Sequence, residues 1–111
     1  MSDSLGDLQK VRLPTVEVLR ALLAAARPVY GFEIIRATDL STMTVYSILT
    51  KLRRLGWITS EREAVNVVVH RTPREFHQLT AGGATKALAV VDQWRARHGD
   101  DGLSDVDRRA A

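Results

Sequence analysis

The segment between Ser41 and Gly56 constrains the fold of this chain more than any other part of its sequence. Serine is favoured just before a helix and glycine just beyond its end, which predicts a helix over residues 42–55. At about 100° per residue, one side of this helix collects the apolar residues Val45, Ile48, Leu49 and Leu52, with Leu55 at its edge. The opposite side has no acidic residue and consists of Met43, Ser47, Thr50 and Arg54, flanked by Thr44, Tyr46 and Lys51. Solvated helix faces usually mix acidic and basic residues, so this acid-free face is expected to contact a partner.

The rest of the chain predicts elements on both sides of this helix. Apolar residues recur at helical spacing both before this helix and near the C-terminal end of the chain. Directly after Gly56, β-branched and aromatic residues indicate extended segments. The position of the hairpin turn is left open by the sequence. The expected elements are helices over residues 15–26 (capped by Thr15), 32–37 and 81–97 (capped by Thr80), and extended segments over residues 57–59, 65–69 and 76–79.

This order of elements predicts an α+β, mostly helical fold, a winged helix-turn-helix of three helices and a two-stranded wing, followed by a C-terminal dimerisation helix. The helix over residues 42–55 would be the recognition helix. The expected organisation is a flexible segment over residues 1–12, a winged-helix DNA-binding domain over 13–80, the dimerisation helix over 81–98 and a disordered tail over 99–111.

Composition favours one folded domain with a basic surface. The 111 residues are 45% hydrophobic and 26% charged, a balance typical of globular proteins, and there is no cysteine for a disulfide or a thiolate ligand. The formal net charge is +3, but the last 12 residues carry four Asp and two Arg, so the other 99 carry +5. Arginine outnumbers lysine by 13 to 3, and arginine suits bidentate contacts with phosphate and guanine. Nucleic acid is therefore a candidate partner.

Other classes of function lack support in the sequence. No signal peptide is visible, and the longest apolar stretch, residues 21–26, is far shorter than the roughly 20 residues of a membrane span, so a cytoplasmic protein without membrane contact is expected. The histidines at 70, 77 and 98 are too scattered for a metal site. No paired acids, nucleophile elbow or phosphate-binding loop is present, so neither catalysis nor a cofactor is expected.

Three motifs resemble the PadR family of bacterial transcriptional regulators. Gly31-Phe32-Glu33-Ile34 is similar to the Gly-Tyr-Glu-Ile element that opens the second helix of that family. The stretch over residues 41–49, followed by Leu52, Leu55 and Gly56, is similar to its recognition helix, and residues 74–83 are similar to the returning strand of its wing. Two departures are Ser47, where the family usually has proline, and Glu75, where it often has a basic residue. The resemblance implies a repressor that binds a pseudo-palindromic operator in double-stranded DNA.

The predicted DNA contacts lie on the recognition helix and on the wing. Hydroxyl groups can donate or accept at base edges, and a methionine can contact a thymine methyl. Lys51 and Arg54 have an alternative role at the negative end of the helix dipole, Tyr46 is either a phosphate ligand or a packing residue, and the wing arginines are alternatively solvated charges. The candidate set is Ser41, Thr42, Met43, Thr44, Tyr46, Ser47, Thr50, Lys51, Arg54, Arg71 and Arg74.

The last helix is expected to join two copies of the chain. The first three helices already supply a core, so the apolar residues of the last helix are left for a homodimer interface, with candidates Leu19, Leu88, Val91 and Trp94. By resemblance to one PadR-like repressor, Trp94 is also a candidate platform for a small aromatic effector, although burial in the interface is the simpler role. The alternative function for the whole chain is a winged-helix module that binds another protein, as an adaptor or antirepressor, without binding DNA.

Overall fold

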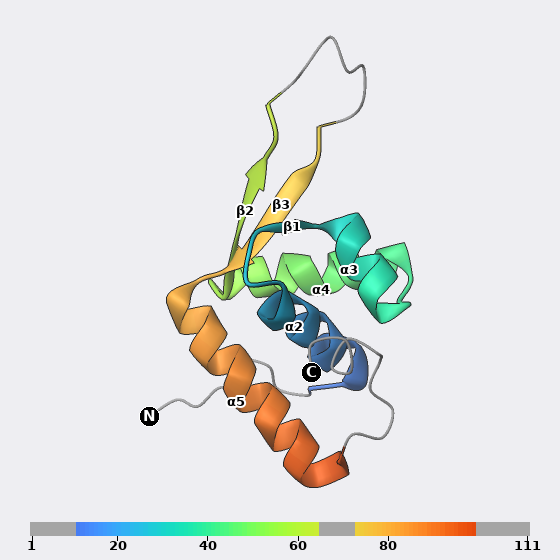
Figure 1. Cartoon of the computed structure of the whole chain (residues 1–111), viewed down its shortest axis with the longest axis vertical. Coiled ribbons are helices and arrows are strands. Elements are labelled where there is room, and N and C mark those ends of the chain that lie inside the picture. Colours follow the sequence, from blue (N-terminus) through green and yellow to red (C-terminus); the bar gives the residue numbers. More distant parts are fainter. Residues whose placement is uncertain (1–10, 65–72, 100–111) are drawn as a thin grey trace.

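The computed structural model describes residues 11–64 and 73–99. A helical layer carries a small sheet that extends away from it as a wing (Figure 1). The elements in chain order are α2 (Leu13–Ala25), β1 (Val29–Tyr30), α3 (Gly31–Thr38), α4 (Thr42–Arg54), β2 (Ile58–Arg62), β3 (Glu75–Leu79) and α5 (Ala81–His98). This is a winged helix-turn-helix with one further C-terminal helix, which confirms the predicted fold class.

The sheet contains one strand that the sequence did not predict. Its order is β1-β3-β2, and both pairings are antiparallel. Val29 pairs with His77 and Tyr30 with Phe76, so β1 holds the loop before α3 against the base of the wing. The two-stranded wing is thereby part of a three-stranded sheet with β3 at its centre.

The core lies where α2 crosses the other helices. α2 runs between α4 and α5 (Figure 1) and contributes Val16, Val18 and Leu19, all completely buried. α4 adds Val45, Leu49 and Leu52, and Trp57 closes the core at the start of the wing. The apolar side predicted for the recognition helix is thus the side that packs.

Most predicted helix ends agree with the structure, but the start of the first helix does not. Thr15 was expected to cap it, whereas α2 begins at Leu13 after Arg12, which makes no side-chain capping bond. Pro14 in the first turn explains the earlier start, because a proline there costs no helical hydrogen bond. Ser41 and Thr80 do cap their helices, accepting hydrogen bonds from the backbone N–H groups of Thr44 and Gly83. The run over residues 65–69 and Arg71 lie outside the described residues.

α5 packs on α2 of the same chain, which corrects part of the predicted dimer interface. Leu19 and Val91 are buried inside the protomer, because α5 lays Gly83, Ala87, Val90 and Val91 on the core. The first three helices therefore do not complete the core by themselves, since α5 supplies part of it. Leu88 alone of the large aliphatic candidates faces outward, with 53% of its surface exposed, and Trp94 is half-buried at the edge of the core. No helix in the described part of the chain is both long and apolar enough to cross a membrane.

Candidate nucleic-acid interface

The outer face of α4 is uncovered and holds most of the predicted DNA contacts. Met43 is 84% exposed, more than any other large hydrophobic residue in the described part of the chain. Ser41, Thr42, Tyr46, Ser47, Thr50, Lys51 and Arg54 are also exposed, and Thr44 is half-buried. Within residues 11–64 and 73–99, neither Lys51 nor Arg54 forms an ion pair with an acidic side chain. The helix therefore presents hydroxyl, thioether and positively charged groups to solvent.

Several of the hydroxyl groups on this face are already hydrogen-bonded within the helix. The Ser41 hydroxyl accepts from the Thr44 backbone N–H at 3.1 Å and donates to Thr44 Oγ1 at 2.9 Å. Thr50 Oγ1 donates to the carbonyl oxygen of Tyr46 at 2.9 Å. Ser41 and Thr44 thus act mainly as capping residues, whereas Thr42 and Ser47 keep hydroxyls that no described residue engages.

Tyr46 connects α4 to the first turn of α3. A side chain at Gly31 would run into the ring and hydroxyl of Tyr46, so the absence of a Cβ there lets the phenol lie against the α3 backbone. Tyr46 remains 42% exposed. It is therefore both a packing residue and a surface residue, and its phenol lies beside the N-terminus of α3.

An arginine and aromatic cluster lies around the start of α3 and the outer half of β3. The rings of Tyr30 and Phe32 are stacked with centroids 6.5 Å apart, and Phe76 meets Tyr30 edge-on at 5.8 Å. The Arg74 guanidinium lies 4.6 Å from the Tyr30 ring centroid, and that of Arg36 lies 5.8 Å from Phe32. Such cation–π contacts restrain an arginine without neutralising it. Phe32 is 53% exposed, whereas Ile34 is the residue of α3 that lies in the core.

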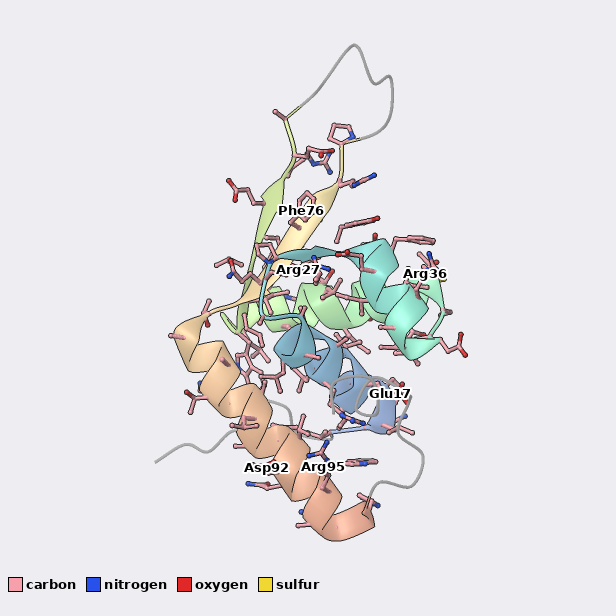
Figure 2. All side chains as sticks on the ribbon, viewed as in Figure 1. Glu17, Arg27, Arg36, Phe76, Asp92 and Arg95 are labelled. Atoms are coloured by element: carbon pink, nitrogen blue, oxygen red, sulfur yellow. The ribbon has the colours of Figure 1, made fainter. Side chains whose placement is uncertain are left out.

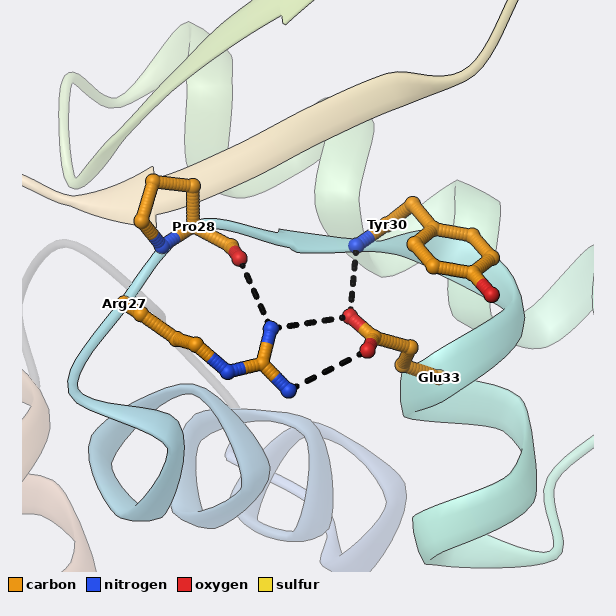
Figure 3. Close-up of polar contacts among 4 residues, drawn as sticks. All are labelled: Arg27, Pro28, Tyr30 and Glu33. Carbon is orange, nitrogen blue, oxygen red and sulfur yellow. Dashed lines mark hydrogen bonds and ion pairs between the residues drawn. The ribbon is translucent and has the colours of Figure 1, made fainter.

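A bidentate ion pair between Arg27 and Glu33 holds the loop between α2 and α3 (Figure 3). Arg27 donates from Nη1 and Nη2 to the two carboxylate oxygens of Glu33, at 3.3 and 3.1 Å, and also to the carbonyl of Pro28. Glu33 accepts the Tyr30 backbone N–H at 3.1 Å, which satisfies a free donor at the start of α3. Partial burial raises the pKa of Glu33, but the bonds from Arg27 and Tyr30 together outweigh burial, and the pKa falls below its ordinary value.

The remaining charged residues near α4 divide between two roles. Arg53 lies 3.5 Å from Glu75 and links the end of α4 to β3, so it is not available to a partner in the way that Lys51 and Arg54 are. Glu75, the departure from the PadR pattern, thus has a structural contact inside the chain. Arg74, one residue earlier, is exposed beside Tyr30.

His77 and the ring pair Trp94–His98 contact groups within the chain. His77 is buried, its Nδ1 lies 2.8 Å from Ser60 Oγ, and burial lowers its pKa below the ordinary value. No group of three potential metal ligands occurs among the described residues. The Trp94 ring lies 4.0 Å from the His98 ring, and no described residue accepts a hydrogen bond from its buried indole N–H.

Figure 2 shows where six labelled residues lie on the molecule. Arg27, Arg36 and Phe76 lie around β1, α3 and the wing, whereas Glu17, Asp92 and Arg95 lie around α2 and α5. Nine of the predicted DNA contacts thus lie on or just before α4, and Arg74 lies apart from them, next to the outer end of β3 over Tyr30. The arginine and aromatic cluster was not predicted, because Phe76 is distant in sequence from Tyr30 and Phe32 and only the β1–β3 pairing brings it to them.

The fold is shared with known transcriptional regulators. No protein-family model matches the sequence, and no curated protein does. A PadR family transcriptional regulator from Eggerthella lenta is 21% identical with a TM-score of 0.60, covering 72% of each chain. A PadR-like transcription factor from Bacteroides fragilis is 22% identical with a TM-score of 0.59, covering 74% of this chain and 82% of that one. BpsR of Bordetella bronchiseptica, whose DNA binding is regulated by 6-hydroxynicotinic acid, is 16% identical with a TM-score of 0.63, over 92% of this chain and 74% of its own. At the level of the fold, these matches confirm the resemblance to PadR-like regulators.

Proposed function

We propose that this winged-helix chain is a sequence-specific, DNA-binding transcriptional regulator that acts as a dimeric repressor on a pseudo-palindromic operator. The observation that carries the proposal is the outer face of α4, which is exposed and free of acidic residues. A face that only meets solvent has no reason to exclude acids, whereas a face that meets phosphates does. The fold shared with transcriptional regulators supports the same function.

The geometry is suited to a major groove. In helix-turn-helix proteins the N-terminal residues of the recognition helix contact base edges, and flanking elements contact the backbone. On this chain Thr42, Met43, Tyr46 and Ser47 occupy the first two turns of α4, and Lys51 and Arg54 occupy its far end. Arg74, next to the outer end of β3 and held over Tyr30, would contact a phosphate on the flank.

Dimerisation would use the outer surface of α5. Leu88 is an exposed leucine on a helix whose opposite side is already in the core, and Trp94 lies half-buried further along the same helix. A second copy that covers these residues places two α4 helices on one face of the DNA, in successive major grooves. Repression then follows from competition for the promoter. An aromatic effector near the paired Trp94 side chains is a further part of the proposal, supported by the regulation of BpsR by 6-hydroxynicotinic acid.

DNA binding is tested by its dependence on salt. Duplexes from the region upstream of the gene for this chain are titrated by fluorescence anisotropy at several salt concentrations. About six phosphate contacts per dimer predict a loss of roughly a thousandfold in affinity between 50 and 200 mM salt. Absence of salt-dependent binding to any duplex would reject a DNA-binding function and favour the protein-binding module.

The dimer is tested with one substitution on α5. Leu88→Asp places a charge on the proposed interface without entering the core, because Leu88 is exposed in the protomer. We expect a wild-type dimer and a folded monomeric variant by light scattering at micromolar concentration. Gln93→Asp, also at an exposed position of α5, is the matched control. A wild-type monomer would refute the dimer.

A further inference from the structure

The first two and a half turns of α4 contain none of the side chains that usually read bases. Between Ser41 and Thr50 there is no Arg, Lys, Asn, Gln, Asp or Glu. Bidentate recognition of guanine uses Arg or Lys, and that of adenine uses Asn or Gln. These contacts are therefore unavailable on the part of the helix that enters a groove most deeply.

The hydrogen-bonding capacity of this stretch is reduced further by the structure itself. Ser41 and Thr44 bond to each other at the helix cap, and Thr50 bonds back to the carbonyl of Tyr46. A threonine that uses its hydroxyl in this way still presents its methyl group. What remains for base edges is the hydroxyls of Thr42 and Ser47, the phenol of Tyr46 and the thioether of Met43.

Met43 dominates this surface in exposed apolar area. It is 84% exposed on the second residue of a helix that Ser41 caps, so its backbone is held in place while its side chain projects into solvent. Ser47 lies four residues later, one turn along the same face. In the major groove the one apolar feature of a base edge is the C5-methyl group of thymine.

We propose that Met43 selects the operator half-site by contacting a thymine C5-methyl group, with Ser47 beside it, and that guanine recognition plays no part in the first two turns of α4. The inference rests on the proposed DNA-binding function and deepens it, because it names the chemical group on the DNA that is read. Lys51 and Arg54, at the opposite end of the helix, then contribute affinity through phosphates and not base discrimination.

The size of the effect follows from the burial of one methyl group. About 0.8 kcal/mol per buried carbon corresponds to roughly fourfold in affinity, at 1.4 kcal/mol per factor of ten. Deoxyuridine lacks only this methyl group and pairs with adenine as thymine does. Replacing thymine by deoxyuridine therefore isolates the methyl contact from base pairing.

The experiment begins with selection of tight binders from a random duplex library, using the full chain. Each thymine of the selected half-site is then replaced singly by deoxyuridine, and each replacement is titrated against wild type, Met43→Ser and Met43→Leu. At one or more positions we expect deoxyuridine to weaken wild-type binding about fourfold, and Met43→Ser to remove that difference. Met43→Leu, which keeps the apolar contact, should retain it.

Three outcomes would overturn the inference. In the first, every deoxyuridine duplex binds within experimental error of its thymine parent, so that no methyl group is read. In the second, the difference persists undiminished in Met43→Ser, so that another residue reads the methyl group. In the third, no duplex is enriched at all, which refutes the proposed function together with the inference; the first two leave DNA binding intact.

Discussion

Two adjacent glycines at the start of α5 are expected to respond in opposite ways to the same substitution. A Cβ at Gly83 would collide with the backbone carbonyl of Trp57, whereas a Cβ at Gly82 would meet nothing within 4 Å. Both residues are in the first turn of α5, so both gain helix propensity on replacement by alanine. The pair therefore separates the effect of close packing from the effect of propensity.

The collision at Gly83 involves a carbonyl that already holds the junction together. The Trp57 carbonyl accepts the Thr80 backbone N–H at 2.9 Å and the Thr80 hydroxyl at 3.2 Å, and that hydroxyl accepts from the Gly83 N–H at 2.8 Å. Because the obstacle is backbone, Gly83→Ala must move α5 away from the start of β2. Overpacking costs about 1–3 kcal/mol and a disturbed hydrogen bond about 1 kcal/mol, against up to about 1 kcal/mol gained in propensity.

The expected net change for Gly83→Ala is a loss of about 2 kcal/mol in the free energy of unfolding, or roughly 8 °C in Tm for a chain of this size. Gly82→Ala should raise the free energy of unfolding by about 0.5 kcal/mol. Urea and thermal unfolding, followed by circular dichroism at one fixed protein concentration, measure both. A Gly83→Ala variant as stable as Gly82→Ala would refute the close contact between α5 and Trp57.

Three further predictions concern the surface of α4, the wing and the buried histidine. Ser47→Glu combined with Thr50→Glu should leave the thermal unfolding unchanged and weaken operator binding about a hundredfold or more, since like charges at an interface cost several kcal/mol. Gln93→Glu on α5 is the control, and unchanged binding by the double variant would show that the DNA interface lies elsewhere. Arg74→Gln should lower the slope of log K against log salt by about one per protomer, and an unaltered slope would show that Arg74 contacts no phosphate. Burial lowers the pKa of His77 in the folded state. The contribution of His77 to the free energy of unfolding is therefore complete above its unfolded pKa of about 6.5 and is lost as the pH falls from there through the folded pKa. Urea titrations at successive pH values should show this loss in the wild type and a smaller loss in His77→Phe.

The helix α4 was predictable because the sequence features that define it are local. Ser41 and Gly56 mark its ends, and its apolar side is repeated over three turns, so no distant contact is needed to define it. β1 was not predictable, because two residues have no periodicity and Val29–Tyr30 become a strand only by pairing with His77 and Phe76. The aromatic cluster depends on the same pairing and was missed for the same reason.

The side of α5 that packs was ambiguous in the sequence for a different reason. Ala84, Leu88, Val91 and Trp94 follow helical spacing, and Ala87 and Val90 widen the same stripe, so the sequence does not fix which edge of the stripe faces the core. The structure buries Gly83, Ala87, Val90 and Val91 and leaves Leu88 exposed, and Gly83 lets α5 approach the backbone of Trp57 closely. Close approach is a property of the assembled chain, which explains why helical spacing alone did not identify the buried side.

The proposed mode of base reading has a consequence for the number of subunits. If each apolar contact discriminates about fourfold, three such contacts on one α4 helix discriminate about sixtyfold. Specific regulators bind their sites roughly 10³–10⁷ times more tightly than other DNA, so one protomer would fall short of this range. Two protomers multiply their discrimination to about 4,000-fold, which lies within it. The proposed pairing through α5 would therefore supply the specificity that a single α4 helix without arginine or amide contacts in its first two turns lacks, and Leu88→Asp is expected to reduce the preference for the operator more than it reduces binding to random DNA.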